Sequence, residues 1–117
     1  TDVVESGRTY HVVIPCSLSA PSYQLVDNPK YPRIVEDYES SFRTLRGLPC
    51  DVYLGGHSWD FDLHAKTRGM AADSSRNPFV DPDGYRRWLD RAEAALRKQI
   101  EAQRQGRKQP GPDGDRK

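Results

Sequence analysis

The sequence predicts an α/β fold built around one β-α-β unit. A β-rich run at residues 9–14 is followed by an amphipathic helical pattern at about residues 32–46. A second short apolar run, Val52-Tyr53-Leu54, comes next and stops at Gly55-Gly56. A helix that joins two strands of one sheet makes them parallel, and such crossovers are almost always right-handed. The sequence therefore predicts a right-handed β-α-β unit over residues 9–56.

The first strand of this unit is expected to pair with the residues before it. Val3 and Val4 precede Glu5-Ser6-Gly7, which is a turn signal, so residues 2–15 are predicted to form a hairpin. Residues 12–14 are continuously apolar, which is typical of a strand covered on both faces. We expect His11 to be an ordinary strand residue near the rim of the sheet.

The first helix is predicted from about Pro32 to Arg46. Proline suits the first helical position, and Gly47 is expected to end the helix. Acidic residues lie early in this segment and arginines lie late, which matches the helix dipole. Its apolar residues recur at spacings of three and four and predict one buried stripe, formed by Ile34, Val35, Tyr38, Phe42 and Leu45.

Two more helices are expected after the second strand. A short helix is predicted from about Leu63 to Arg68, with Asp62 as its N-cap and Gly69 as its stop. A longer helix is predicted to begin at Pro82 with Asp81 as its N-cap. The ordered domain is expected to cover residues 1–104. Residues 105–117 hold mainly Gly, Pro, Gln and charged residues and are predicted to be disordered.

Composition excludes several classes of protein. The chain has 117 residues, 18 basic and 17 acidic, and a formal net charge of +1. Both signs are mixed along the chain and give no strongly basic face, so a nucleic-acid partner is not expected. No apolar run approaches the roughly 20 residues of a membrane span, and no signal peptide is seen. The chain begins at Thr1 within a strand pattern, and we expect part of the fold to precede it.

The predicted functional residues follow the two parallel strands. Ser17 and Ser19 come directly after the first strand, and His57 comes after the second. Since parallel strands end at the same edge of a sheet, the three side chains are expected to meet where α/β proteins bind ligands. Two alternatives stay open: a turn and a packed loop histidine, or a metal site of His57, Asp60 and Asp62. Trp59 and Phe61 are expected either to line a pocket or to cover the sheet.

The two cysteines are not expected to pair. In parallel strands Cys16 would lie level with His57, and Cys50 would lie about six residues away, or roughly 20 Å. A disulfide needs Cα atoms within about 7 Å of each other. The sequence therefore predicts no bond between Cys16 and Cys50.

Several segments, taken together, resemble the C-terminal part of class B metallo-β-lactamases of the third subclass. The resemblance covers residues 2–104 and rests on the order and spacing of these segments, since no single motif is decisive. They are Cys16-Ser17-Leu18-Ser19-Ala20-Pro21, Asn28-Pro29-Lys30-Tyr31-Pro32, Asp37-Tyr38 to Phe42, Leu48-Pro49-Cys50-Asp51-Val52, and Asn77-Pro78-Phe79-Val80-Asp81-Pro82 with Gly84-Tyr85.

The resemblance implies a four-layer αβ/βα sandwich with two zinc ions at one edge of its sheets. A hydroxide held by these ions attacks the β-lactam carbonyl, because zinc lowers the pKa of bound water. His57 matches the histidine that binds the second zinc. Ser17 and Ser19 match hydroxyl residues that help to hold the substrate carboxylate. The family implies a periplasmic or secreted enzyme that confers antibiotic resistance.

This sequence departs from the family pattern at most of the metal ligands. It lacks H-x-H-x-D-H and the later Gly-His-Thr histidine, which lie upstream in the family, so His57 is one of six usual ligands. We therefore expect an inactive segment whose partner is the N-terminal half of the same domain. Cys50 matches a family cysteine that often pairs downstream, but no cysteine follows it here. Alternatives are a related hydrolase of esters, thioesters or lactones, or a non-enzymatic interaction module.

Overall fold

The computed structural model describes residues 1–73 and 75–108 of the chain. Their elements occur in the order β1 (Asp2–Glu5), β2 (Arg8–Cys16), α1 (Ile34–Gly47), β3 (Val52–Gly55), the 3₁₀ turn η1 (Ser58–Phe61), α2 (Leu63–Ala72) and α3 (Pro82–Lys108). The predicted α/β fold is confirmed. None of the helices in this part of the chain is both long and apolar enough to cross a membrane.

The three strands form one sheet in the order β1-β2-β3. β1 and β2 form the predicted antiparallel hairpin, with Val3 opposite Tyr10. β2 and β3 are parallel, as predicted, with Val13 opposite Tyr53. Cys16 lies opposite Gly55, so the expectation that it lies level with His57 was wrong by two residues; the register shifts between Val13 and Cys16. Because β2 and β3 end at the same register, the segments that follow them leave the same edge of the sheet.

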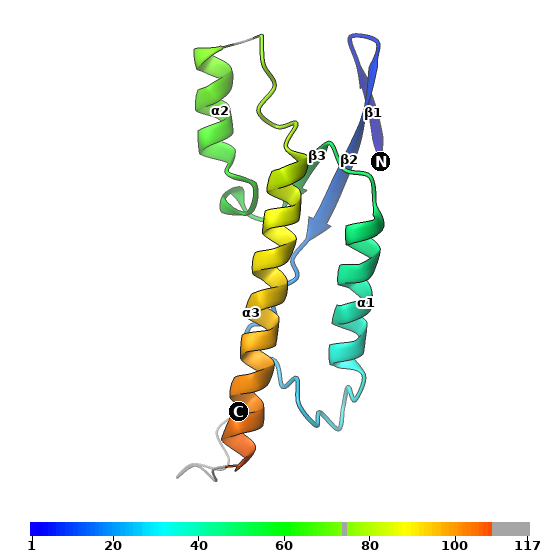
Figure 1. Ribbon diagram of the computed structural model, residues 1–117, viewed down its shortest axis with the longest axis vertical. Helices are drawn as coiled ribbons and strands as arrows, with labels where there is room; N and C mark the ends of the chain where they lie inside the picture. The colour runs from blue at the N-terminus through cyan, green and yellow to red at the C-terminus, as the bar shows by residue number, and fades with distance from the viewer. Residues whose placement is uncertain (74, 109–117) are drawn as a thin grey trace.

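Helices α1 and α3 pack with the sheet around Tyr53. In Figure 1 α3 passes in front of β3, α1 lies to its right, and β2 ends between the two helices. Tyr53, Phe42 of α1 and Leu89 of α3 are the largest fully buried side chains. The Tyr53 ring also lies 5.8 Å from the Tyr85 ring and 6.2 Å from the Trp88 ring, centroid to centroid. This cluster is the core on which the rim of the sheet is built.

The predicted helix ends were correct in part. α1 begins at Ile34 and not at Pro32, because a turn in which the Ile34 N–H donates to the Tyr31 carbonyl, at 3.2 Å, precedes it. α2 continues through Gly69 to Ala72, beyond the predicted stop. Gly69 lies against Pro78. A glycine within a helix costs about 1 kcal/mol relative to alanine, so α2 continues here in spite of its sequence.

The two predicted N-caps differ in whether their side chains make a cap hydrogen bond. Asp62 occupies the N-cap position of α2, but its backbone is left-handed (φ 55°) and its side chain makes no cap hydrogen bond. Asp81 caps α3 as predicted, since its Oδ1 accepts the Gly84 N–H at 3.0 Å. α3 runs to Lys108, past the boundary expected at about residue 105. Residues 109–117 of the predicted tail lie outside the described residues.

Candidate functional site

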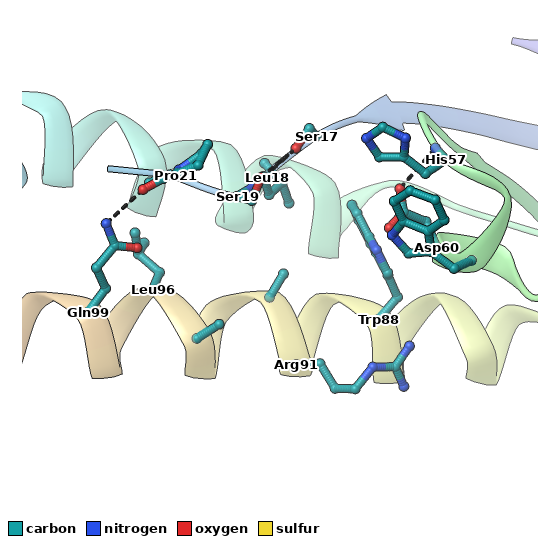
Figure 2. A pocket seen from close by; sticks show the side chains of 14 residues that line it. Ser17, Leu18, Ser19, Pro21, His57, Asp60, Trp88, Arg91, Leu96 and Gln99 are labelled. Carbon is teal, nitrogen blue, oxygen red and sulfur yellow. Dashed lines mark hydrogen bonds between the residues drawn. The ribbon is translucent and has the colours of Figure 1, made fainter. Parts of the chain in front are cut away.

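A pocket of about 530 Å³ lies where β2 and β3 end. Ser17, Ser19 and His57 all line it, and Figure 2 shows them along one side of the pocket, with α3 on the opposite side. The cause is the parallel register, which places Cys16 opposite Gly55 and so brings the next residues of both strands to one rim. The predicted meeting of the three residues is confirmed, and their roles stay predictions.

The two serines form a linked pair of hydroxyl groups. The Ser17 and Ser19 Oγ atoms lie 2.9 Å apart, and the Ser19 N–H donates to the Ser17 Oγ at 3.3 Å. The Tyr38 hydroxyl of α1 donates to the Ser19 carbonyl at 3.1 Å, which holds this turn in place. Of the two exposed hydroxyls only one donates to the other, so the second hydrogen can be donated to a bound anion.

The His57 segment is held by reciprocal bonds with Asp60. The His57 backbone N–H donates to the Asp60 Oδ2 at 3.1 Å, and the Asp60 N–H donates to the His57 carbonyl at 3.0 Å. The imidazole stacks on the Trp59 ring, with centroids 4.3 Å apart and planes at 6°. Trp59 thus lines the pocket, and Phe61 is buried beneath the rim, so each matches one of the two expected roles.

Gly55 permits this arrangement by its lack of a side chain. A Cβ atom at that position would lie 2.3 Å from the Cβ of Asp60. The glycines at the end of β3 were expected to allow such a close approach, and Gly55 does so. The strand end and the Asp60 loop can therefore pack directly against each other and present His57 at the surface.

The opposite wall of the pocket comes from α3, which includes Gln99. Gln99 and Gln103 of α3 also hold the loop that follows β2, a role that the sequence did not indicate. The Gln99 Nε2 donates to the Ala20 carbonyl at 2.7 Å. One turn later, the Gln103 Oε1 accepts the Leu25 N–H at 2.8 Å. Glutamines in a charged helix carry no sequence signal that distinguishes this role from a solvated face. They anchor the loop after β2 to α3, while Arg91 extends from α3 away from the serines in Figure 2.

Lys66 is a further residue whose role the sequence did not indicate. Its side chain is buried, with the Nζ atom 4.5 Å from the centroid of the Tyr53 ring and 3.4 Å from the Asp81 Oδ2. The Nζ makes no hydrogen bond of good geometry, so the ion pair and the aromatic ring accommodate its charge. Lys66 therefore joins α2 to the start of α3 beneath the rim.

The described residues do not complete a zinc site. Within residues 1–73 and 75–108, no group of three His, Cys, Asp or Glu side chains could hold a metal ion. The alternative site of His57, Asp60 and Asp62 is thus wrong, because these three side chains do not form such a group, and the Asp60 Oδ2 accepts the His57 backbone N–H. Zinc needs three or four protein ligands, and His57 offers one imidazole.

Cys50 does not contribute to this edge. It is a free cysteine, as predicted, and packs against the core at the start of β3. Burial, with Asp51 as a second cause, raises the pKa of its thiol to about 11. A thiol with this pKa stays protonated near neutral pH and is a poor metal ligand and nucleophile.

No family model matches the sequence. Several solved structures, however, are similar to this chain in fold and in sequence. The native FEZ-1 metallo-β-lactamase from Legionella gormanii shares 35% sequence identity and superposes with a TM-score of 0.81 over 88% of this chain. BJP-1, a subclass B3 metallo-β-lactamase of Bradyrhizobium japonicum, shares 28% identity with a TM-score of 0.81 over 90% of this chain. A metallo-β-lactamase of Cronobacter sakazakii shares 34% identity with a TM-score of 0.70 over 82%.

The match covers only part of each of these proteins. The chain spans 39% of the Legionella and Bradyrhizobium chains and 36% of the Cronobacter chain. Both the fold and the sequence agree over nearly all of the described residues, with identities of 34–35% for two of the three. This chain is therefore similar, in fold and in sequence, to a part of metallo-β-lactamases that include subclass B3 enzymes.

Proposed function

We propose that this chain is the C-terminal segment of a zinc-dependent enzyme that hydrolyses the β-lactam ring of antibiotics. The observation that carries the proposal is the pocket in which Ser17, Ser19 and His57 meet, in a chain 35% identical to a metallo-β-lactamase. The complete enzyme would be periplasmic or secreted and would confer resistance. On its own the segment is expected to be inactive.

Each of the three residues has a distinct role in this proposal. The imidazole of His57 would be one ligand in a two-zinc site whose other ligands come from the N-terminal half of the domain. Zinc in a complete site supplies hydroxide near neutral pH. The Ser17 and Ser19 hydroxyls would donate hydrogen bonds to the substrate carboxylate, and Tyr38 would keep Ser19 in position through its carbonyl.

A chimeric enzyme tests the proposal directly. The matching 39% of the Legionella enzyme would be replaced by residues 1–108 of this chain, and zinc content and hydrolysis of the chromogenic cephalosporin nitrocefin would be measured. We expect the chimera to bind zinc and to turn over the substrate. The 117-residue chain alone should do neither, and His57→Ala should lower the zinc content of the chimera. Robust turnover by the chain alone would refute the segment hypothesis.

The serine pair can be tested in the same chimera. We expect the Ser17→Ala and Ser19→Ala double variant to raise KM about tenfold with a smaller change in kcat, since a hydrogen bond to a charged group contributes about 1.5 kcal/mol or more. Ser40→Ala, which removes a hydroxyl of α1 outside this pocket, is the matched control. An unchanged KM in the double variant would favour a hydrolase of another ester, thioester or lactone.

A further inference from the structure

A second pocket of about 650 Å³ lies on the other side of the loop that follows β2. It is formed between this loop and α1, and three tyrosines line it: Tyr23, Tyr31 and Tyr38. Asp37 lines it as well, one residue before Tyr38 in the helix. Ser17 borders both pockets, so the second pocket adjoins the candidate site without containing His57.

The charged groups that line the second pocket are of one sign only. Asp37 is its only charged lining residue among those that the structure describes, and neither lysine nor arginine lines it. The Tyr31 hydroxyl donates to the Asp37 Oδ2. This bond to a carboxylate is the main cause of a raised pKa at Tyr31, so the phenol stays neutral. The pocket therefore has one negative charge among neutral groups.

Two of the three tyrosines are placed by hydrogen bonds of their hydroxyl groups, and the third is placed by its backbone. Tyr31 is tied to Asp37, and Tyr38 is tied to the Ser19 carbonyl. Tyr23 is held through its backbone, since its carbonyl accepts a hydrogen bond from the Gln103 Nε2 at 2.8 Å. Tyr23 and Tyr31 are 49% and 45% exposed, which leaves ring surface free to contact a ligand.

We propose that this pocket binds a small organic cation of the quaternary ammonium class. Electron-rich ring faces attract cations, and several aromatic rings around a methylated ammonium group are a common means of recognising it. The Asp37 carboxylate adds a Coulombic attraction. A quaternary ammonium ion cannot donate hydrogen bonds and so suits a pocket in which the hydroxyls of Tyr31 and Tyr38 are already engaged with other groups.

Titration with a cation and its neutral isostere tests this proposal. Choline and 3,3-dimethylbutan-1-ol have nearly the same shape, but only choline carries a charge. Both would be titrated into the metal-free 117-residue chain and followed by NMR. We expect choline to bind at least about fivefold more tightly than the neutral alcohol and to shift resonances of the three tyrosines. Equal affinity for both compounds, or no saturable choline binding, would overturn the proposal.

Variants separate the contributions of charge and ring. Asp37→Asn and Tyr23→Leu should each weaken choline binding about two- to fivefold, whereas Tyr23→Phe keeps the ring and should retain most of it. Tyr10→Leu removes a tyrosine outside the pocket and should have no effect. Circular dichroism confirms that each variant is folded, and a folded Asp37→Asn or Tyr23→Leu variant with unchanged affinity would contradict the assignment. Because neither zinc nor a β-lactam is used, the outcome is independent of the proposed hydrolysis.

Discussion

The core around Tyr53 and the rim that holds the pockets are stabilised in different ways. In the core, side chains from β3, α1 and α3 are almost completely buried and contact one another through apolar surface. At the rim, the loop after β2 also buries Leu18, Ala20 and Leu25. Its backbone groups are in addition hydrogen-bonded to the side chains of Gln99, Gln103 and Tyr38. Large rim side chains such as Trp59 stay exposed.

This difference shows how a small segment can be ordered and still present side chains for binding. Because polar anchors use backbone carbonyl and N–H groups, the serine hydroxyls, the imidazole and the tyrosine rings are left accessible. Apolar packing would have buried the same side chains. Substitutions in the two regions should therefore affect different properties of the protein.

The largest expected contrast is between a small core residue and a large rim residue. Leu89→Ala should lower the free energy of unfolding by about 2–5 kcal/mol, because it opens a cavity at a fully buried position. Trp59→Ala removes a larger side chain, but one that is 70% exposed, and should cost less than about 1 kcal/mol. Urea denaturation of both variants checks the comparison, which fails if the Trp59 variant loses as much stability as the Leu89 variant.

Gly55 lies where the core strand meets the rim, and its substitution should have an intermediate effect. A Cβ added there would overlap the Asp60 side chain, so Gly55→Ala should destabilise the protein by about 1–3 kcal/mol and displace the His57 loop. Gly47→Ala is the matched control. Nothing lies within 4 Å of that Cβ, and alanine in α1 should stabilise by up to about 1 kcal/mol. Thermal unfolding measures the stabilities, and the His57 ring resonances report the loop; equal effects at both glycines would rule out the close contact at Gly55.

The smallest effect on stability near neutral pH is expected from the thiol of Cys50, which is protonated there in both the folded and the unfolded chain. With its pKa raised to about 11 by burial, Cys50 in a Cys16→Ser background should be alkylated on the order of 100-fold more slowly at pH 8 than in denaturant, where the thiol has an ordinary pKa. Since folding favours the protonated thiol, this contribution to stability is fully present below about pH 9 and is lost as the pH rises through about 11. Rapid alkylation of the folded chain at pH 8 would show that the core does not protect this position.

Much of the fold could be predicted from residue patterns. The hairpin of β1 and β2, the parallel pairing of β2 with β3, and the Asp81 cap of α3 all follow from local signals and from the geometry of a crossover. The helix ends were less predictable. Gly69 is accommodated within α2, where Pro78 from a later segment packs beside it, and no local pattern contains that contact.

The candidate site, like the fold, was predictable only in part. The sequence by itself determined that Ser17, Ser19 and His57 share an edge, because strand order and parallel direction are enough to place the ends of β2 and β3 together. Only the tertiary structure decided how that edge is shaped: Gln99 and Gln103 anchor the loop, Lys66 is buried against Tyr53, and three tyrosines gather beside Asp37. These contacts join residues far apart in the chain, and their energies depend on burial and distance, which a local pattern of residue types does not contain.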